Sequence, residues 1–208
     1  MISPEDEAVV AAQLGRPPRG LRVVAHRCPC GLPDVVETAP RLPDGTPFPT
    51  LYYLTCPKAA AAISGLESSG LMREMTARLA QDEQLRSSYQ QAHRDYVARR
   101  DAAAVTEGLD PLLSGTQSAG GMPDRVKCLH ALAAHELAVP GTNPLGREAL
   151  DAAGHWWSRG SCAVISRGDA PPYPPMSART GPDRKNRDRI RPGSVDQDQS
   201  EDQAKETE

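Results

Sequence analysis

The chain has 208 residues and a mass of 22.3 kDa, which is enough for one domain with a packed core. Hydrophobic residues make up 38% of it and aromatic residues only 4%, so part of the chain lacks the side chains to join that core. A formal net charge of -3 gives no general attraction to nucleic acid or anionic membranes, so nucleic acid is not an expected partner. No stretch approaches the ~20 apolar residues that span a bilayer, and the acidic residues 5–7 are unlike a secretory signal, so we expect a cytoplasmic protein.

The first quarter of the chain predicts a helix followed by a small sheet. Ser3 suits a helix N-cap, Pro4 the first helical position and Gly15 a helix end, so we expect a helix over about 4–14. Three runs rich in β-branched or aromatic residues follow, each bounded by Pro, Gly or Asp: residues 21–27, 34–38 and 50–55. The turns between them favour a small antiparallel sheet of about three strands.

From Pro57 onward the hydrophobic pattern has the period of a helix. It predicts helices at about 59–66, 71–79, 82–104, 124–139 and 144–157. The helix over 124–139 is apolar on both sides, which is typical of a helix that crosses the middle of a domain. The predicted fold class is therefore α+β, with a small antiparallel sheet followed by a mainly helical region.

The composition divides the chain into three parts. Residues 1–19 form an N-terminal helix and linker, residues 20–165 a single α+β domain, and residues 166–208 a tail. The tail has a basic block followed by an acidic block and almost nothing apolar to bury, so we expect it to be disordered. A solvated polyampholyte is the favoured interpretation, because the acidic block competes with any nucleic acid or membrane for the same arginines.

The five cysteines are the feature most informative about function. An odd number excludes complete pairing in internal disulfides, and thiols stay reduced in the cytoplasm, so metal binding or a free thiol is the better interpretation. Cys28 and Cys30 flank Pro29 in a predicted turn between two strands, where backbone amides can donate to thiolate sulfur. Cys56 precedes Pro57 and so occupies the N-cap of a helix, facing the positive end of its dipole.

Cys128 and two histidines belong to the predicted central helix. Cys128 and His135 share one face of it, while His130 joins them only if the helix begins late. Thiolate and imidazole ligands suit zinc and iron–sulfur clusters, and these two cofactors remain open. The candidate metal ligands are Cys28, Cys30, Cys56, Cys128, His130 and His135. Cys162 and His93 lie outside this pattern and are interpreted as bystanders.

A second hypothesis is a protein-interaction module without catalytic chemistry. Aromatic side chains often anchor such interfaces, and the candidates here are Tyr89, Tyr96 and the pair Trp156 and Trp157. The partner would be a protein of unknown identity, and the tail would add solubility.

A third hypothesis is an enzyme with Cys56 as its nucleophile. Such an enzyme needs a base and a carboxylate that orients the base. The base would be His130 or His135, and the carboxylate Glu136 or Asp124.

Three short strings form a specific combination in this sequence. They are TPFPTLYYLTCP at residues 46–57, GGMPDRVKCLH at residues 120–130 and NPLG at residues 143–146. This combination resembles a bacterial family known as domain of unknown function 501, over about residues 20–157. The resemblance implies a small cytoplasmic bacterial protein without an assigned activity, so it brings no mechanism.

The resemblance also bears on the candidate ligands. It implies that the recurring strings of the family include Cys28, Cys56, Cys128, His130 and His135. The position of Cys30 is often another residue in that pattern. Leu132 stands where the pattern has a histidine, so a zinc-binding Cys-x3-His-x2-His face is incomplete here unless Cys30 substitutes as a ligand.

Overall fold

A hairpin and a third strand form the sheet in the computed structural model. The strands are β1 (Leu21–Arg27), β2 (Pro33–Thr38) and β3 (Tyr52–Leu54). All pairs are antiparallel and the order is β1-β2-β3, so that Val36 lies opposite Val24 on one side and opposite Tyr53 on the other. The predicted three-stranded antiparallel sheet and the α+β class are confirmed.

Six helices accompany the sheet in the part of the chain that the structure describes. They are α1 (Pro4–Leu14), α2 (Pro57–Ser68), α3 (Leu71–Gln81), α4 (Glu83–Thr106), α5 (Leu129–Ala138) and α6 (Pro144–Ala153). Two 3₁₀ turns, η1 (Ala119–Gly121) and η2 (Trp156–Arg159), complete the list. The predicted N-caps Ser3 and Asn143 accept backbone N–H groups from Asp6 and Gly146, which explains why α1 and α6 begin where they do.

The described residues are 2–42, 44–112 and 118–163, and they belong to one compact unit, residues 1–174. The tail predicted over 166–208 lies outside them. A hydrogen bond joins α1 to the sheet: Gln13 Nε2 donates to the carbonyl of Pro33, the first residue of β2, at 2.7 Å. Among these residues, no helix combines the length and the apolar character that crossing a membrane requires.

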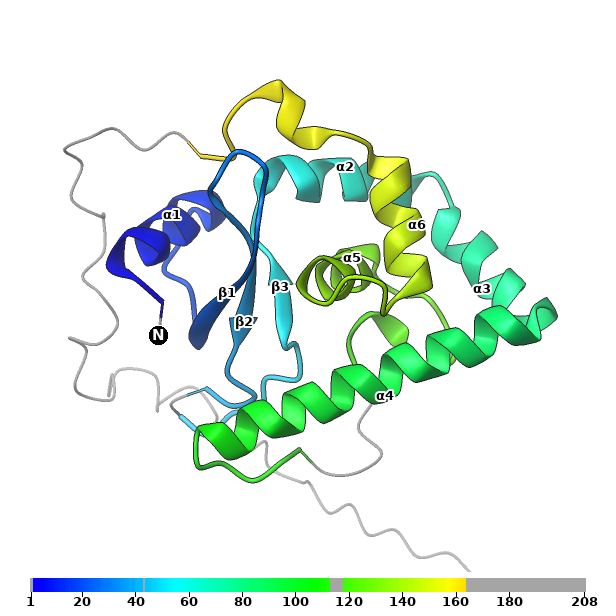
Figure 1. Cartoon of the computed structure of the whole chain (residues 1–208), viewed down its shortest axis with the longest axis horizontal. Helices are drawn as coiled ribbons and strands as arrows, with labels where there is room; N and C mark the ends of the chain where they lie inside the picture. Colours follow the sequence, from blue (N-terminus) through cyan, green and yellow to red (C-terminus); the bar gives the residue numbers. More distant parts are fainter. Residues whose placement is uncertain (1, 43, 113–117, 164–208) are drawn as a thin grey trace, which may run out of the picture. The chain divides into compact units, whose positions relative to one another are not determined.

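Helix α5 lies at the centre of this unit. Figure 1 shows it between the sheet and α6, while α1 lies on the opposite side of the sheet. Its side chains are apolar around most of its circumference, and Leu129, Leu132 and Ala133 are fully buried, which confirms the prediction of a central helix. Gly146 allows α6 to approach, because a Cβ atom there would lie only 2.2 Å from the Leu132 carbonyl oxygen.

The start of α5 differs from the expectation. A helix was expected over 124–139, but α5 begins at Leu129 with Cys128 as its N-cap residue in extended conformation. The backbone before Cys128 is held in a loop and not in a helix, because the Lys127 N–H donates a hydrogen bond to the Gly120 carbonyl at 2.7 Å. Cys128 therefore lies before the helix and does not share a helical face with His135.

The end of α6 also differs from the expectation. The last helix was expected to reach Trp157, but it ends at Ala153 and a separate 3₁₀ turn carries both tryptophans. Gly154 separates them with φ 64° and ψ -151°, a conformation that does not continue a helix. The chain therefore turns after α6.

Helix α4 buries the aromatic stripe that its sequence predicted. Tyr89 and Tyr96 have no exposed surface, and the Tyr96 hydroxyl accepts the Leu51 N–H at 2.6 Å. Trp156 is also buried. Of the four aromatic anchors expected for a partner, these three are therefore occupied by the protein's own core.

Candidate metal centre

The turn between β1 and β2 presents Cys28 and Cys30. The Gly31 N–H donates to the Cys28 carbonyl at 2.8 Å, and the Cys28 N–H donates to the Leu32 carbonyl at 3.0 Å. Pro29 fits the second position of this turn, and Gly31 has φ 88°, which glycine adopts at little cost. The turn thus holds two thiols, separated by one residue, at the end of the β1–β2 hairpin.

Cys56 is held by the start of α2. It is the N-cap residue, Pro57 is the first helical residue, and Cys56 Sγ accepts the Ala59 N–H at 3.5 Å. The predicted N-cap position is confirmed. Its side chain has no exposed surface, so the sulfur points into the protein.

Cys162 brings these segments together. Its Sγ atom lies 2.8 Å from that of Cys56, 3.3 Å from that of Cys28 and 3.4 Å from that of Cys30. The turn η2 precedes it, and Trp156 of that turn belongs to the same buried hydrophobic cluster as Cys28, Cys56 and Cys162, with Cys30 packed against it. The sulfurs of Cys28, Cys30 and Cys56, from two other segments, therefore surround the sulfur of Cys162.

The distances around Cys162 decide what such a cluster can be. A disulfide needs about 2.05 Å between sulfur atoms, and no cysteine among the described residues is disulfide-bonded. Four sulfurs about 2.3 Å from a tetrahedrally coordinated ion stand roughly 3.8 Å apart. A disulfide can use only one of the three close pairs, whereas one ion placed among the sulfurs can use all of them. The cysteine cluster could therefore hold a metal ion.

Burial and crowding change the acidity of these thiols. Burial raises the pKa of Cys28, and burial together with the neighbouring thiols raises the pKa of Cys162. Cys30 differs, because burial is outweighed by the backbone N–H groups of Leu32 and Cys162, so its pKa falls below the ordinary value. A cation among the sulfurs would reverse the cost of the negative charges, since a coordinated thiol is deprotonated.

Cys128 and His130 lie in a second cluster, together with Glu67 at the end of α2. One side-chain atom of each lies within 4.8 Å of the others. His130 Nδ1 is 3.0 Å from a Glu67 carboxylate oxygen, and the Leu129 N–H donates to the same oxygen at 2.7 Å. All three side chains are partly exposed, whereas Cys28, Cys56 and Cys162 of the first cluster are buried.

His135 lies in the core. Its ring stacks on Tyr52 with 5.8 Å between ring centres, and its Nε2 is 3.2 Å from the Asp95 carboxylate. Its Nδ1 lies 3.4 Å from the Asn143 side-chain nitrogen. Burial lowers the pKa of His135, so it is held as a neutral polar group inside the helical layer.

Of the predicted ligands, the structure brings Cys28 and Cys30 into one group with Cys162, and Cys56 contacts the Cys162 sulfur of that group. Cys128, His130 and His135 lie elsewhere. The fourth sulfur comes from Cys162, which was interpreted as a bystander. Glu136, an expected orienting carboxylate, is buried and accepts the N–H groups of Gly141 and Asn143 at 2.7 and 2.8 Å. Its carboxylate therefore stabilises the turn after α5, and it is not the carboxylate that orients a catalytic base.

One sequence signal could have identified Cys162. The pair Trp156 and Trp157 stands shortly before it, and large aromatic residues indicate that the chain is still packed there. Cys162 lies outside the predicted helices and strands, which is why it was interpreted as a bystander.

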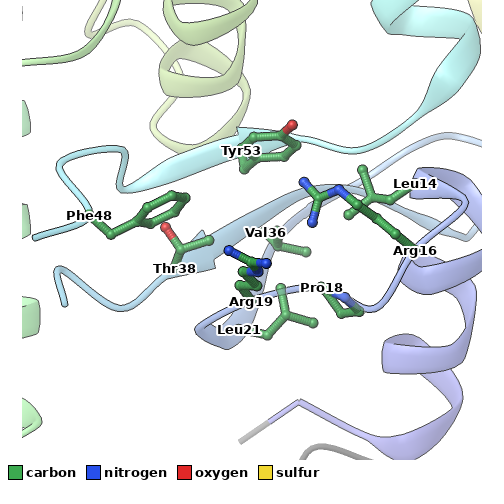
Figure 2. Close-up of a pocket in the computed structure, with 9 residues that line it drawn as sticks. All are labelled: Leu14, Arg16, Pro18, Arg19, Leu21, Val36, Thr38, Phe48 and Tyr53. Carbon is green, nitrogen blue, oxygen red and sulfur yellow. The ribbon is translucent and has the colours of Figure 1, made fainter. Parts of the chain in front are cut away.

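Two cavities have Leu14 and Tyr53 in their walls. One, of about 590 Å³, has Cys128 and His130 in its wall together with Leu14 and Tyr53. The other, of about 350 Å³, shares Leu14 and Tyr53 and adds two arginines. Figure 2 shows the guanidinium groups of Arg16 and Arg19 beside the apolar side chains of this second pocket.

A comparison with curated proteins finds no match, and a comparison with solved structures finds none either. A family model matches residues 24–151, with the description Protein of unknown function (DUF501). This range includes three of the four clustered cysteines and the second cluster, while Cys162 lies beyond it. The chain belongs to the DUF501 family.

Proposed function

We propose that this protein binds one zinc ion through Cys28, Cys30, Cys56 and Cys162. The observation that carries the proposal is the position of Cys162 Sγ, which lies 2.8 to 3.4 Å from three other cysteine sulfurs at once. One disulfide satisfies only one of these three approaches, whereas an ion would engage all of the sulfurs. Cys28, Cys30 and Cys162 already lie within 4.8 Å of one another, and Cys56 would join them through its contact with Cys162 as the sulfurs move apart to the roughly 3.8 Å of a tetrahedral site.

The spacing favours a single ion over an iron–sulfur cluster. A cluster places iron and sulfide between its cysteine ligands, which keeps their sulfurs farther apart than direct ligands of one ion. Sulfur atoms 2.8 to 3.4 Å from Cys162 Sγ are nearer to the roughly 3.8 Å spacing of a one-ion site than to the wider spacing around a cluster. Among single ions, four thiolates in tetrahedral geometry are typical of zinc.

The proposed role of the ion is structural. Four protein ligands fill a tetrahedral zinc site and leave no position for water or substrate. The ligands come from the β1–β2 turn, the start of α2 and the segment after η2, so the ion would link segments more than a hundred residues apart in sequence. Three of the four sulfurs belong to buried residues, which suits an ion that takes part in folding.

Elemental analysis of the full-length protein tests this proposal. We expect one zinc per chain, and the ion should be lost when Cys28, Cys56 or Cys162 is changed to serine. Cys128→Ser is the matched control, because this cysteine lies in the other cluster and should leave the zinc content at one. Cobalt substitution adds a second readout, since tetrahedral thiolate coordination gives strong visible absorption that Cys162→Ser should remove.

Two results would contradict the proposal. One is a protein that is folded, carries no zinc after purification and does not take up zinc or cobalt when either is added. The other is a zinc ion that survives Cys162→Ser and disappears with Cys128→Ser, which would place the metal in the second cluster.

A further inference from the structure

The second cluster is independent of the zinc proposal. Glu67 lies in the last turn of α2, and Cys128 and His130 stand at the start of α5, so two packed helices hold the three side chains together. One atom from each lies within 4.8 Å of the others. A thiol, an imidazole and a carboxylate in such a group have a limited set of chemical uses.

Hydrogen bonds determine the charge of His130. Nδ1 lies 3.0 Å from the Glu67 carboxylate, and Nε2 lies 3.1 Å from the Ala60 carbonyl oxygen. Both oxygens accept hydrogen bonds, so both ring nitrogens donate, and an imidazole that donates from both nitrogens is a cation. The Ser64 hydroxyl, 3.3 Å from Nε2, is then a second acceptor of the Nε2 proton. In agreement, interaction with Cys128 raises the pKa of His130 to about 9, with Glu67 adding to the rise and burial opposing it.

The same hydrogen bonds disfavour two uses of His130. The three side chains are close enough to hold a metal ion, but a metal binds the lone pair of a neutral imidazole nitrogen and would have to displace one of these protons. A general base needs a free lone pair as well. What remains is electrostatic: a fixed positive charge beside a sulfur atom.

The surroundings of Cys128 give a small molecule access to that sulfur. Cys128 and His130 form part of the wall of the cavity of about 590 Å³, whose other walls include Tyr53 and Leu54. A volume of this size suits a small organic molecule. Cys128 also stands at the N-terminus of α5 and makes no side-chain capping bond there, so its sulfur is not used by the helix.

We propose that Cys128 undergoes thiol–disulfide exchange with small disulfides that enter this cavity. The Cys128 thiolate attacks one sulfur of R–S–S–R, a new S–S bond forms, and the old S–S bond breaks to release R–S⁻. Cys128 is oxidised to the mixed disulfide and the departing sulfur is reduced, while a second thiol can reverse the step. No proton has to move in this reaction, which suits a histidine whose two protons are already held.

The other cysteines are less suited to this reaction. Cys28, Cys56 and Cys162 are buried with at most 2% of their surface exposed, so a disulfide cannot approach their sulfurs without opening the protein. Cys30 is partly exposed, but it is not in the wall of the cavity of about 590 Å³, and in the proposed zinc site it is bound to the metal. None of the hydrogen bonds of the described residues places an imidazole beside these sulfurs. Cys128 combines partial exposure, a neighbouring cation and a cavity.

The test uses the full-length protein as purified and 5,5′-dithiobis(2-nitrobenzoate) at pH 7, followed by peptide mapping. We expect one fast equivalent, located at Cys128 and absent from Cys128→Ser. His130→Gln should slow the fast step roughly tenfold, because the positive charge beside the reacting sulfur is gone. His93→Gln is the matched control and should react like the wild type, since His93 bonds to Ser118 on another part of the structure.

Peptide mapping of the wild type gives a result even if a variant fails to fold. Fast labelling at a cysteine other than Cys128, or an unchanged rate in folded His130→Gln, would overturn the proposal. So would a second zinc ion that is lost with Cys128→Ser and that blocks labelling while bound. Failure of the four-cysteine zinc site has a different signature: the partly exposed Cys30 is then labelled as well, while Cys128 is still labelled and His130→Gln still slows its labelling.

Discussion

The two cysteine clusters use the same side chain in opposite surroundings. Around Cys162 the neighbours are three other sulfurs, and most of the group is buried. Around Cys128 the neighbours are an imidazole and a carboxylate, and the group opens on a cavity. A buried group of sulfurs could hold a metal ion, whereas a half-exposed thiol beside an imidazole and a cavity is open to reaction.

Because of this contrast, we expect replacement of a cysteine by serine to have a different effect in each cluster. Removing a sulfur from the first cluster should cost stability, because it removes a link between distant segments. Removing the sulfur of Cys128 should cost reactivity and little stability. Substitutions that separate these consequences test the contrast directly.

The largest expected effect is that of Cys162→Ser. Loss of a bound metal belongs to the changes that cost more than about 4 kcal/mol. For a chain of this length that corresponds to a fall of roughly 10 °C in Tm, measurable by calorimetry or circular dichroism. Cys128→Ser should shift Tm by no more than about 2 °C, and equal shifts for the two variants would contradict the contrast.

A smaller effect is expected from His135→Gln. This change removes the stacking on Tyr52 and disturbs the contact with Asp95, which should cost about 2 kcal/mol in the free energy of unfolding. Because His135 faces the core and not the sulfurs, the zinc content should stay at one per chain. Elemental analysis beside urea denaturation separates the two readouts, and a zinc-free but folded variant would return His135 to the list of ligands.

A still smaller effect concerns the pH dependence of stability. The folded pKa of His130 is about 9, above the value of about 6.5 for an unfolded chain. A raised pKa gives a stabilising contribution that is complete below about pH 6.5 and is lost as the pH rises through about 9. The difference in unfolding free energy between the wild type and His130→Gln should therefore shrink by roughly 1 kcal/mol from pH 6 to pH 10, after solvent screening. A difference that grows with pH has the opposite sign and would refute a cationic His130.

The smallest effect is the relative influence of Cys128 and Glu67 on His130. The interaction with Cys128 contributes more to the raised pKa of His130 than does Glu67. Proton NMR titration of the imidazole should therefore show a larger fall in the His130 midpoint for Cys128→Ser than for Glu67→Gln. The reverse order would mean that the carboxylate, and not the sulfur, is the main partner of the ring.

The fold could be predicted from local patterns. Strand β1 occupies the predicted residues 21–27, and α1 and α4 lie close to the predicted ranges because their caps and apolar stripes are local signals. The start of α5 could not be predicted in this way. It depends on the Lys127 N–H bonding to the Gly120 carbonyl, a loop contact that hydrophobic periodicity does not contain.

The candidate site was predictable only in part, for the same physical reason. The turn chemistry around Cys28 and Cys30 and the Cys56–Pro57 helix start are local features, and both are observed. Which distant cysteine joins them is a question of tertiary structure. Helical spacing favoured Cys128, but the late start of α5 removes that argument, and the turn after α6 brings Cys162 to the sulfurs instead.

The most direct measurement of the central claim is X-ray absorption at the zinc edge of the full-length protein. Four thiolate ligands predict a single shell of four sulfur atoms at about 2.3 Å, with no nitrogen shell. Cys128→Ser should give the same spectrum. A shell of nitrogen atoms at about 2.0–2.1 Å would place histidine on the metal and contradict the assignment of Cys162 as the fourth ligand.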